Sequence, residues 1–445
     1  SKSGCDSSYS ATAGSRSVTF SGESGGARKL RRLTACNAMD AVTWDEGAFL
    51  DLLTKLIGET AHLQNNPPEQ IPKEDRAVRH ILEILEPLST EHGGPLQIQH
   101  VSFVDGRGNL IVEYPGTGEE CISVVGCHLD VVSANPDAWE RDPFKLTVEG
   151  DKLYGRGTTD CLGHAAILTM IMAELGRRRP VLNKTMVAVF IANEENSKQH
   201  GIGVDELVRR GMLDHLKSGP LFWMDTADSQ PCLGTGGMLV WKLKSTGRLF
   251  HSGWPSQAIN SMELAMEAVN ELQARFYKEF PATEQDRLYK FECCSTMKPT
   301  RFESPPGSIN IIPGECSISG DIRLSPFYDG KVVMAKLKEW VEDINANLDK
   351  LPTRGPHSKY DLTPEFEYKG KLELEFAEEY TSGVACNMES FGFKTMLAAW
   401  DEVYGKSSPF SVTGTLPCVR ELKDAGFDLN IFGFGSMKVY HANNE

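Results

Sequence analysis

Carboxylate and imidazole side chains come directly after several apolar runs of this sequence. Most of these runs have the length and composition of buried strands. In an open α/β sheet, the loops at the carboxyl ends of the strands meet in one crevice. We therefore expect these side chains to share one site. The candidates are His128 and Asp130, Asp160, Glu194 and Glu195, Asp225, and His441.

The residue types in this set indicate a metal site. Imidazole and carboxylate donors suit Zn²⁺ or a similar divalent ion and do not suit an iron–sulfur cluster. His128 and Asp130 are two residues apart in a strand and so face the same side. Asp130 could then accept the second ring N–H of a metal-bound His128 and fix its tautomer. Each motif alone has an ordinary explanation, since Asp160 could cap a helix and Asp225 could form a turn.

Glu194 and Glu195 end an apolar strand as an adjacent pair. Side chains that are adjacent in an extended segment diverge. One glutamate can therefore bind a metal while the other faces a substrate as a general base. For this pair in isolation a solvated strand end is the better explanation. The joint placement of all the motifs at one sheet edge is what favours a site.

The surrounding pattern predicts an α/β fold with a mostly parallel sheet flanked by helices on both faces. Apolar runs alternate with segments of helical periodicity. We expect strands over 108–115, 121–129, 185–193, 220–225 and 427–434, and helices over 45–61, 76–86, 161–176, 204–213, 385–404 and 416–425.

A second domain interrupts this pattern. Its elements follow the order β-α-β-β-α-β, which predicts a ferredoxin-like α+β unit over 236–379 inserted into a larger domain formed by 41–235 and 380–445. The expected strands of the inserted unit are 238–246, 289–297, 309–324 and 371–379, and its expected helices are 259–276 and 331–349.

The composition argues against several classes of partner. The 61 acidic and 46 basic side chains give a formal net charge of −15, which disfavours binding to nucleic acid or to an anionic membrane surface. No apolar run approaches the ~18–20 residues that a membrane helix needs. The eleven cysteines lack the spacing of a zinc finger or a disulfide framework, so we expect free thiols in a reducing compartment.

Residues 1–40 differ from the rest of the chain, being rich in Ser, Gly and Arg and poor in acidic residues. This composition resembles an organelle transit peptide, and a disordered terminal tail explains it equally well. The expected location is therefore the cytoplasm, or a plastid or mitochondrion if the segment directs import. Either way we expect the segment to lie outside the fold.

Taken together, the motifs resemble the co-catalytic zinc family of aminoacylases, carboxypeptidases and deacetylases. The resemblance runs from about residue 45 to the C-terminus, and 223–238 and 156–164 look most like the eukaryotic members that act on N-acetylornithine. The motifs that carry it are HLDVV (128–132), GRGTTDCLGH (155–164), NEEN (193–196), TGRLFHSGWPSQAIN (246–260), SINIIPGE (308–315), GDIRLSP (320–326) and HANNE (441–445).

The resemblance implies two divalent metal ions, zinc first and cobalt as the alternative, in a zinc-peptidase-like catalytic domain. Asp160 would bridge the ions, His128 and Asp225 would complete one site, and Glu195 and His441 would complete the other.

The resemblance also implies the remaining roles. Glu194 would be the general base and Asp130 the residue that orients His128. The inserted domain would be a lid that forms a homodimer. His251 of the lid would reach the partner's active site and stabilise the oxyanion, while Asn310 and Arg323 would bind the substrate carboxylate. The substrate would be a small N-acetylated amino acid, with N-acetylornithine as the first choice.

Two departures from the family pattern leave alternatives open. Many relatives have Glu where Asp225 stands, so Asp228 is a nearby competitor as ligand. The family also continues with a helix after the last motif, so we expect either that the sequence is incomplete after Glu445 or that the sheet is capped in another way.

Other functions share much of this pattern. A desuccinylase, a dipeptidase or a broad aminoacylase would have the same metal ligands. A catalytically inactive binding relative would lack a ligand or the base, and neither is missing here. A nucleotide site at GFGSMK (433–438) is disfavoured because a third glycine and a following helix are absent.

Overall fold

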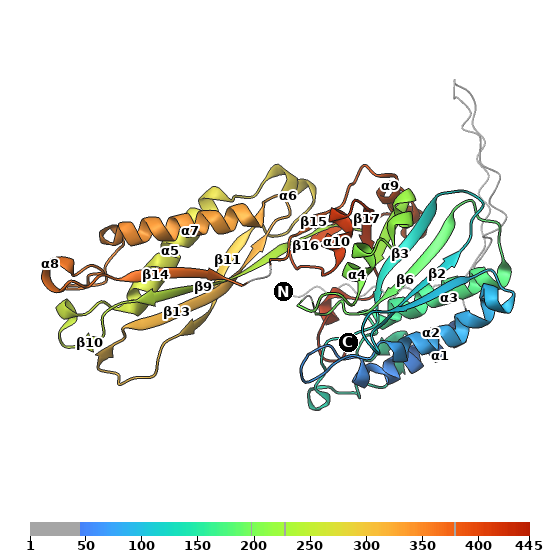
Figure 1. Ribbon diagram of the computed structural model, residues 1–445, viewed down its shortest axis with the longest axis horizontal. Helices are drawn as coiled ribbons and strands as arrows, with labels where there is room; N and C mark the ends of the chain where they lie inside the picture. The colour runs from blue at the N-terminus through green and yellow to red at the C-terminus, as the bar shows by residue number, and fades with distance from the viewer. Residues whose placement is uncertain (1–44, 197, 227, 378–379) are drawn as a thin grey trace, which may run out of the picture. The chain divides into compact units, whose positions relative to one another are not determined.

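The structure is a computed structural model that describes residues 45–445 apart from 197, 227, 378 and 379. The segment 1–40 therefore lies outside the described residues, and the prediction made for it stays a prediction. Two main sheets organise the described chain (Figure 1). Within this part of the chain, no helix has both the length and the apolar character needed to cross a membrane.

The larger sheet has nine strands in the order β1-β2-β6-β3-β7-β17-β8-β15, with β16 paired to β8. Its centre, β6-β3-β7-β17, is parallel, and the pairs β1-β2, β2-β6, β17-β8 and β8-β15 are antiparallel. The strands are β1 (Gln97–Ser102), β2 (Gly108–Tyr114), β3 (Cys121–His128), β6 (Thr185–Ile191), β7 (Pro220–Met224), β8 (Cys232–Thr235), β15 (Val384–Ala385), β16 (Phe410–Val412) and β17 (Asp428–Phe432).

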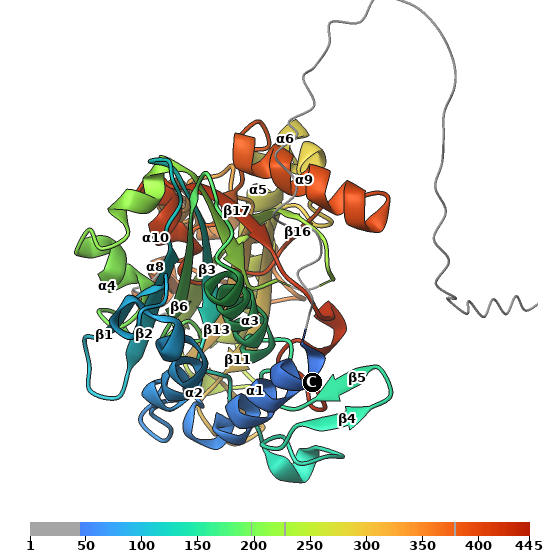
Figure 2. The same ribbon diagram turned by 90° about the vertical axis from the view of Figure 1, so that its right-hand side faces the viewer.

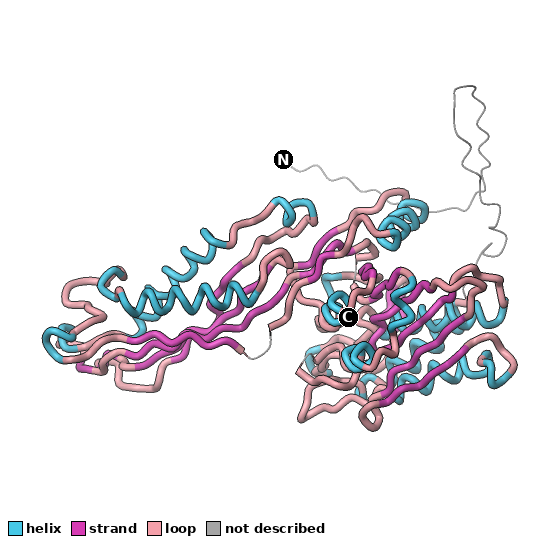
Figure 3. The backbone as a smooth tube through the Cα atoms, turned by 45° about the horizontal axis from the view of Figure 1, so that its top comes forward, coloured by secondary structure: helices cyan, strands magenta, loops and turns pink. Residues whose placement is uncertain are grey.

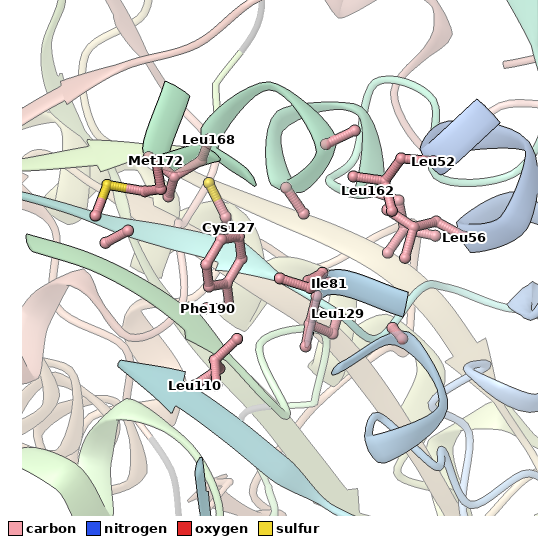
Figure 4. Close-up of a cluster of buried hydrophobic side chains, with 14 of the residues drawn as sticks. Leu52, Leu56, Ile81, Leu110, Cys127, Leu129, Leu162, Leu168, Met172 and Phe190 are labelled. Carbon is pink, nitrogen blue, oxygen red and sulfur yellow. The ribbon is translucent and has the colours of Figure 1, made fainter. Parts of the chain in front are cut away.

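Helices cover both faces of this sheet because its strands are apolar on both sides. On β2, Leu110 and Val112 join the core beneath α1, α2 and α3, whereas Ile111 joins the core beneath α4, α9 and α10 (Figures 2 and 4). The helices are α1 (Glu46–Gly58), α2 (Asp75–Leu85), α3 (Leu162–Arg178), α4 (Val204–Arg209), α9 (Phe391–Tyr404) and α10 (Val419–Asp424).

The smaller sheet is antiparallel, in the order β11-β13-β9-β14, which is the order of a ferredoxin-like unit. Two helices, α5 and α7, pack on one face and share its apolar core (Figure 3). Its elements are β9 (Gly237–Thr246), α5 (Ser261–Glu279), α6 (Glu284–Leu288), β11 (Thr296–Glu303), β13 (Glu315–Leu324), α7 (Gly330–Ala346), α8 (Thr363–Phe366) and β14 (Lys371–Phe376).

Two short antiparallel sheets of two strands each complete the fold. One pairs β4 (Thr147–Glu149) with β5 (Lys152–Tyr154), and the other pairs β10 (Phe250–His251) with β12 (Ile311–Ile312). The predicted fold class is confirmed, namely helices on both faces of a sheet with a parallel centre, and a second α+β sheet. The sheet is more mixed than the sequence indicated, because its edge strands run antiparallel.

Several predicted elements were wrong in their bounds, and two of these differences have a clear local cause. The strand expected over 289–297 begins only at Thr296, because Lys290 has a left-handed backbone (φ 57°) that a strand excludes. The helix expected over 385–404 begins at Phe391, because Val384–Ala385 pairs with β8 and Ser390 then caps the helix through the N–H of Phe393.

Candidate metal centre

Asp160 lies between two imidazoles. Its Oδ1 is 2.8 Å from His128 Nε2, and its Oδ2 is 3.0 Å from His441 Nε2. His128 is the last residue of β3, Asp160 belongs to the turn that leads into α3, and His441 follows the last strand. The two oxygens of one carboxylate thus face two histidines from different parts of the chain.

Two further carboxylates complete this cluster. Glu195 Oε2 is 3.3 Å from His441 Nε2, and Asp225 Oδ1 is 3.4 Å from His128 Nε2. Both residues follow the carboxyl ends of parallel strands, β6 and β7 respectively, which end at the same edge as β3. The donor atoms of His128, Asp160 and Glu195 all lie within 4.8 Å of one another, a spacing that suits a metal ion.

Glu194 points into the same cluster, where it faces His128. Its Oε2 lies 3.9 Å from His128 Nε2, and the residue is only 4% exposed. Its Oε1 is buried and has no hydrogen-bond partner among the described residues, and the same is true of Glu195 Oε1. A buried carboxylate oxygen without a donor is costly. These two oxygens are therefore the atoms for which a bound cation or water would compensate.

The electrostatics show an excess of negative charge. Burial raises the pKa of Glu194 well above that of an exposed glutamic acid, and it raises the pKa of Glu195 to about 7 and that of Asp225 to about 6. Burial also opposes ionisation of Asp160, but hydrogen bonds from the two imidazoles outweigh it and hold its pKa below the usual range. The hydrogen bond to Asp160 raises the pKa of His441 to about 10. Cations bound here would relieve this imbalance.

Asp130 supports the cluster from behind. The carboxylate accepts the backbone N–H groups of Glu194 and Glu195, each at 3.0 Å, and the side-chain amide of Asn65 at 2.8 Å. The Nδ1 of His128 is closer to the main-chain carbonyl oxygen of Asp130 (2.9 Å) than to its carboxylate (3.5 Å). Asp130 therefore orients His128 through its main chain, whereas the sequence predicted this role for the carboxylate.

Asp225 and Asp228 differ clearly in their surroundings. Asp225 is 2% exposed and faces His128, and its main-chain oxygen accepts the hydroxyl of Tyr440 at 2.8 Å. Asp228 is exposed and accepts the N–H of Met437 at 3.0 Å. The geometry favours Asp225 as the ligand on this loop.

Three further residues near the cluster, His164, Cys161 and Glu445, were not predicted from the sequence. His164 is buried, and its Nε2 accepts the N–H of Phe434 at 2.7 Å. Cys161 lies with His128 and Asp225 in a second group whose donor atoms are all within 4.8 Å. The side chain of Glu445 accepts the N–H groups of Thr159 and Asp160, which fixes the turn that carries Asp160. Only the position of these residues next to predicted ligands could have indicated them.

The residues predicted to act from the lid form two separate groups within one chain. His251 Nε2 lies 3.4 Å from the Asn310 amide, because β10 and β12 pair at this point. Arg323 is near the opposite end of β13, where it pairs with Met238, and its Nε donates to Asp321 at 2.7 Å. Glu315 is the first residue of β13 after β12, and it is eight residues from Arg323, or roughly 26 Å at the ~3.3 Å rise of a strand.

Comparison with known proteins places this chain in a family. The acetylornithine deacetylase of Arabidopsis thaliana is 58% identical over 403 residues, which cover 90% of this chain and 91% of that protein. The acetylornithine deacetylase of Dictyostelium discoideum is 49% identical over 414 residues, which cover 90% of this chain and 92% of that protein. This chain belongs to the acetylornithine deacetylase family.

Two further matches concern this family's fold. Residues 233–349 match the family described as Peptidase dimerisation domain. The solved structure of the Bacillus subtilis YxeP protein, a dinuclear metal-binding peptidase of the M20 family, resembles this chain with a TM-score of 0.54 and 16% identity. The match covers 89% of this chain and 92% of that chain. The acetylornithine deacetylase family thus shares its fold with M20 peptidases.

Proposed function

We propose that this protein hydrolyses the amide bond of N-acetyl-L-ornithine and releases L-ornithine and acetate. The observation that carries this proposal is the position of Asp160 between His128 and His441. Glu194 is buried beside them, and its Oε1 has no hydrogen-bond partner in the described part of the chain. That arrangement suits metal-dependent hydrolysis of an amide. The choice of N-acetylornithine is supported by the names of the two deacetylases to which the chain is 58% and 49% identical.

The donor set fits two divalent metal ions, which we propose to be zinc, with cobalt as the alternative. The fit rests on the imidazole and carboxylate donors and on the unpartnered oxygens of Glu194 and Glu195. When bound, the ions would supply the positive charge that makes water acidic and polarises an acyl carbonyl. We assign Asp160 to both ions, His128 and Asp225 to one, and Glu195 and His441 to the other.

Glu194 would act as the general base. Its buried Oε1 is free to take a proton from the attacking water, and the raised pKa of the carboxyl group suits it to hold that proton. The same oxygen then returns the proton to the nitrogen of the departing ornithine, which leaves as a neutral amine. Asp130 would hold Glu194 in place through the backbone N–H of Glu194.

We also propose that the active site is completed by a second copy of the chain, with residues 236–379 as the lid and dimerisation domain. The match of 233–349 to a dimerisation domain supports this. Arg323 and the pair formed by His251 and Asn310 lie at opposite ends of the lid sheet. We therefore assign Arg323 of one subunit to the substrate carboxylate. The partner's Asn310 would bind the same carboxylate, and the partner's His251 would stabilise the oxyanion.

Metal depletion and restoration test this function. The purified protein should release acetate from N-acetylornithine, lose that activity after exhaustive chelation, and regain it when about two equivalents of zinc or cobalt are added per chain. Elemental analysis of each sample provides the metal count. Full activity in a sample shown to contain no metal would overturn the proposal.

A further inference from the structure

A buried network of polar side chains lies behind the proposed base, and the proposed mechanism does not use it. At its centre is an ion pair between Arg107, in the loop before β2, and Glu74, at the start of α2. Arg107 is 2% exposed and Glu74 is 0% exposed. The pair is bidentate, with Nε to Oε2 at 2.5 Å and Nη2 to Oε1 at 2.7 Å. Such a pair has a fixed geometry and can hold a third group in place.

That third group is Asn193, the first residue of the motif NEEN. Its Oδ1 accepts Nη2 of Arg107 at 3.1 Å and Nδ2 of Asn65 at 3.0 Å. Its Nδ2 donates to the main-chain oxygen of Gln199 at 2.7 Å. Every polar atom of this side-chain amide is therefore bound to a different part of the chain.

The backbone of Asn193 is left-handed, with φ at 61°. This turn ends the extended course of β6 and directs the next two N–H groups, those of Glu194 and Glu195, onto the Asp130 carboxylate. Asn65 joins the two halves, because its Nδ2 donates both to Asn193 and to Asp130. The side chain of Asn193 and the carboxylate of Asp130 thus fix the segment that carries the proposed base from two sides.

We propose that Asn193 is a positioning residue for the proposed base Glu194, acting through its side-chain oxygen, which Arg107 and Asn65 hold. This inference rests on the proposed function, because it assigns Glu194 the role of base. Asn193 does more than tolerate a left-handed backbone, which glycine would do at least as well. Its acceptor oxygen fixes the direction in which the chain leaves β6.

Three substitutions at Asn193 separate these two roles. Asn193→Gly keeps the backbone conformation and removes the amide, whereas Asn193→Asp keeps the acceptor oxygen and tolerates the left-handed region less well than glycine. Positioning through the oxygen predicts that kcat falls in the order Asn, Asp, Gly, with the glycine variant lower by ~10–100-fold and KM changed little. A purely conformational role predicts the reverse order of the two variants, with glycine matching the wild type and at least as active as aspartate. Asn193→Ala should be the least active, because alanine lacks the acceptor oxygen and also disfavours the left-handed backbone.

Amide hydrogen exchange gives a second readout that does not depend on the substrate. In metal-depleted protein, the peptide covering Glu194 and Glu195 should exchange at least ~10-fold faster in Asn193→Gly than in the wild type, and at close to the wild-type rate in Asn193→Asp. If the wild type fails to deacetylate N-acetylornithine, the proposed function fails, while the exchange order still tests the role of Asn193.

Arg179→Gly serves as a matched control, because Arg179 is an exposed residue with φ at 52° at the end of α3. It should change neither kcat nor exchange at Glu194. If Asn193→Gly does not fold, Arg107→Lys replaces it, since one ammonium cannot serve both Glu74 and Asn193 in the geometry of the guanidinium. Wild-type kcat and exchange in Asn193→Gly, or in Arg107→Lys where that variant is needed, would overturn the proposal.

Discussion

His128 Nδ1 lies 2.9 Å from the main-chain carbonyl oxygen of Asp130, which is the contact that links the two residues. The carboxylate of Asp130 accepts instead the backbone N–H groups of Glu194 and Glu195. Asp130→Asn should therefore leave the orientation of His128 intact and place an amide N–H₂ against a backbone donor. We expect kcat to fall by ~10–100-fold with the metal content near that of the wild type. Kinetics and elemental analysis check this, and a variant that loses its metal but keeps the rate per bound metal would contradict it.

Glu194 and Glu195 are neighbours with different proposed roles, and each is the control for the other. Glu194→Gln should keep about two metal ions per chain and lower kcat by ~10²-fold or more, because an amide cannot take up the proton. Glu195→Gln should lower metal affinity, since it removes a charged ligand. Metal titration and steady-state kinetics on both variants separate the roles. The reverse pattern would mean that the two assignments are exchanged.

His164 should make the folded protein less stable in acid. Burial lowers its pKa to about 4, and its Nε2 already accepts the N–H of Phe434. In the unfolded chain the pKa of a histidine is near 6.5, so between pH 4 and pH 6.5 the unfolded chain binds more protons than the folded protein. The contribution of neutral His164 to the free energy of unfolding is therefore complete above pH ~6.5. Up to about 3 kcal/mol of it is lost as the pH falls toward 4.

His164→Gln tests this, because its amide oxygen can accept the same N–H and does not titrate. Denaturant unfolding at several pH values should show the wild type losing stability relative to the variant as the pH falls through this window. A constant difference in the free energy of unfolding from pH 7 to pH 4 would show that His164 does not contribute.

His251 provides a test of the composite site. His251→Ala and Glu194→Gln should each be nearly inactive alone. A mixture of the two should recover activity after subunit exchange, because a hybrid dimer contains one site with both groups intact. Mass spectrometry of the intact dimers confirms that exchange has occurred. Exchange without any recovery would mean that each site is built within one chain.

The sequence predicted the cluster at the sheet edge because parallel strands end together, and the positions of His128, Glu195 and Asp225 follow from that rule. His441 was a candidate because it follows the last predicted strand, but a short 3₁₀ turn precedes it, so the rule for strand ends does not place it and only the family resemblance gave it a role as ligand. The bridging position of Asp160 likewise came from the resemblance. The geometry agrees with it, since the two oxygens of that carboxylate face two histidines.

Other features depend on register and burial, which the sequence does not reveal. Arg323 and Asn310 are separated because β13 runs extended from Glu315 to Leu324, while Asn310 lies before it beside the paired β10 and β12, and a motif gives no measure of this separation. The sequence alone would predict two exposed charges at Glu74 and Arg107, because Glu and Arg are mostly exposed in proteins, whereas both are buried. The network around Asn193 joins residues that are far apart in the sequence, so no local pattern predicts it.

The substrate is the most direct test of the proposed function. The measurement is kcat/KM of the purified, metal-loaded protein for N-acetylornithine, N-acetylmethionine, a dipeptide and N-succinyl-diaminopimelate under one set of conditions. The acidic site should tolerate the ornithine amine better than a second carboxylate, so N-acetylornithine should exceed N-succinyl-diaminopimelate by at least ~10-fold, or about 1.4 kcal/mol. Equal values for these two substrates, or a clear preference for N-acetylmethionine or the dipeptide, would contradict the assignment to N-acetylornithine.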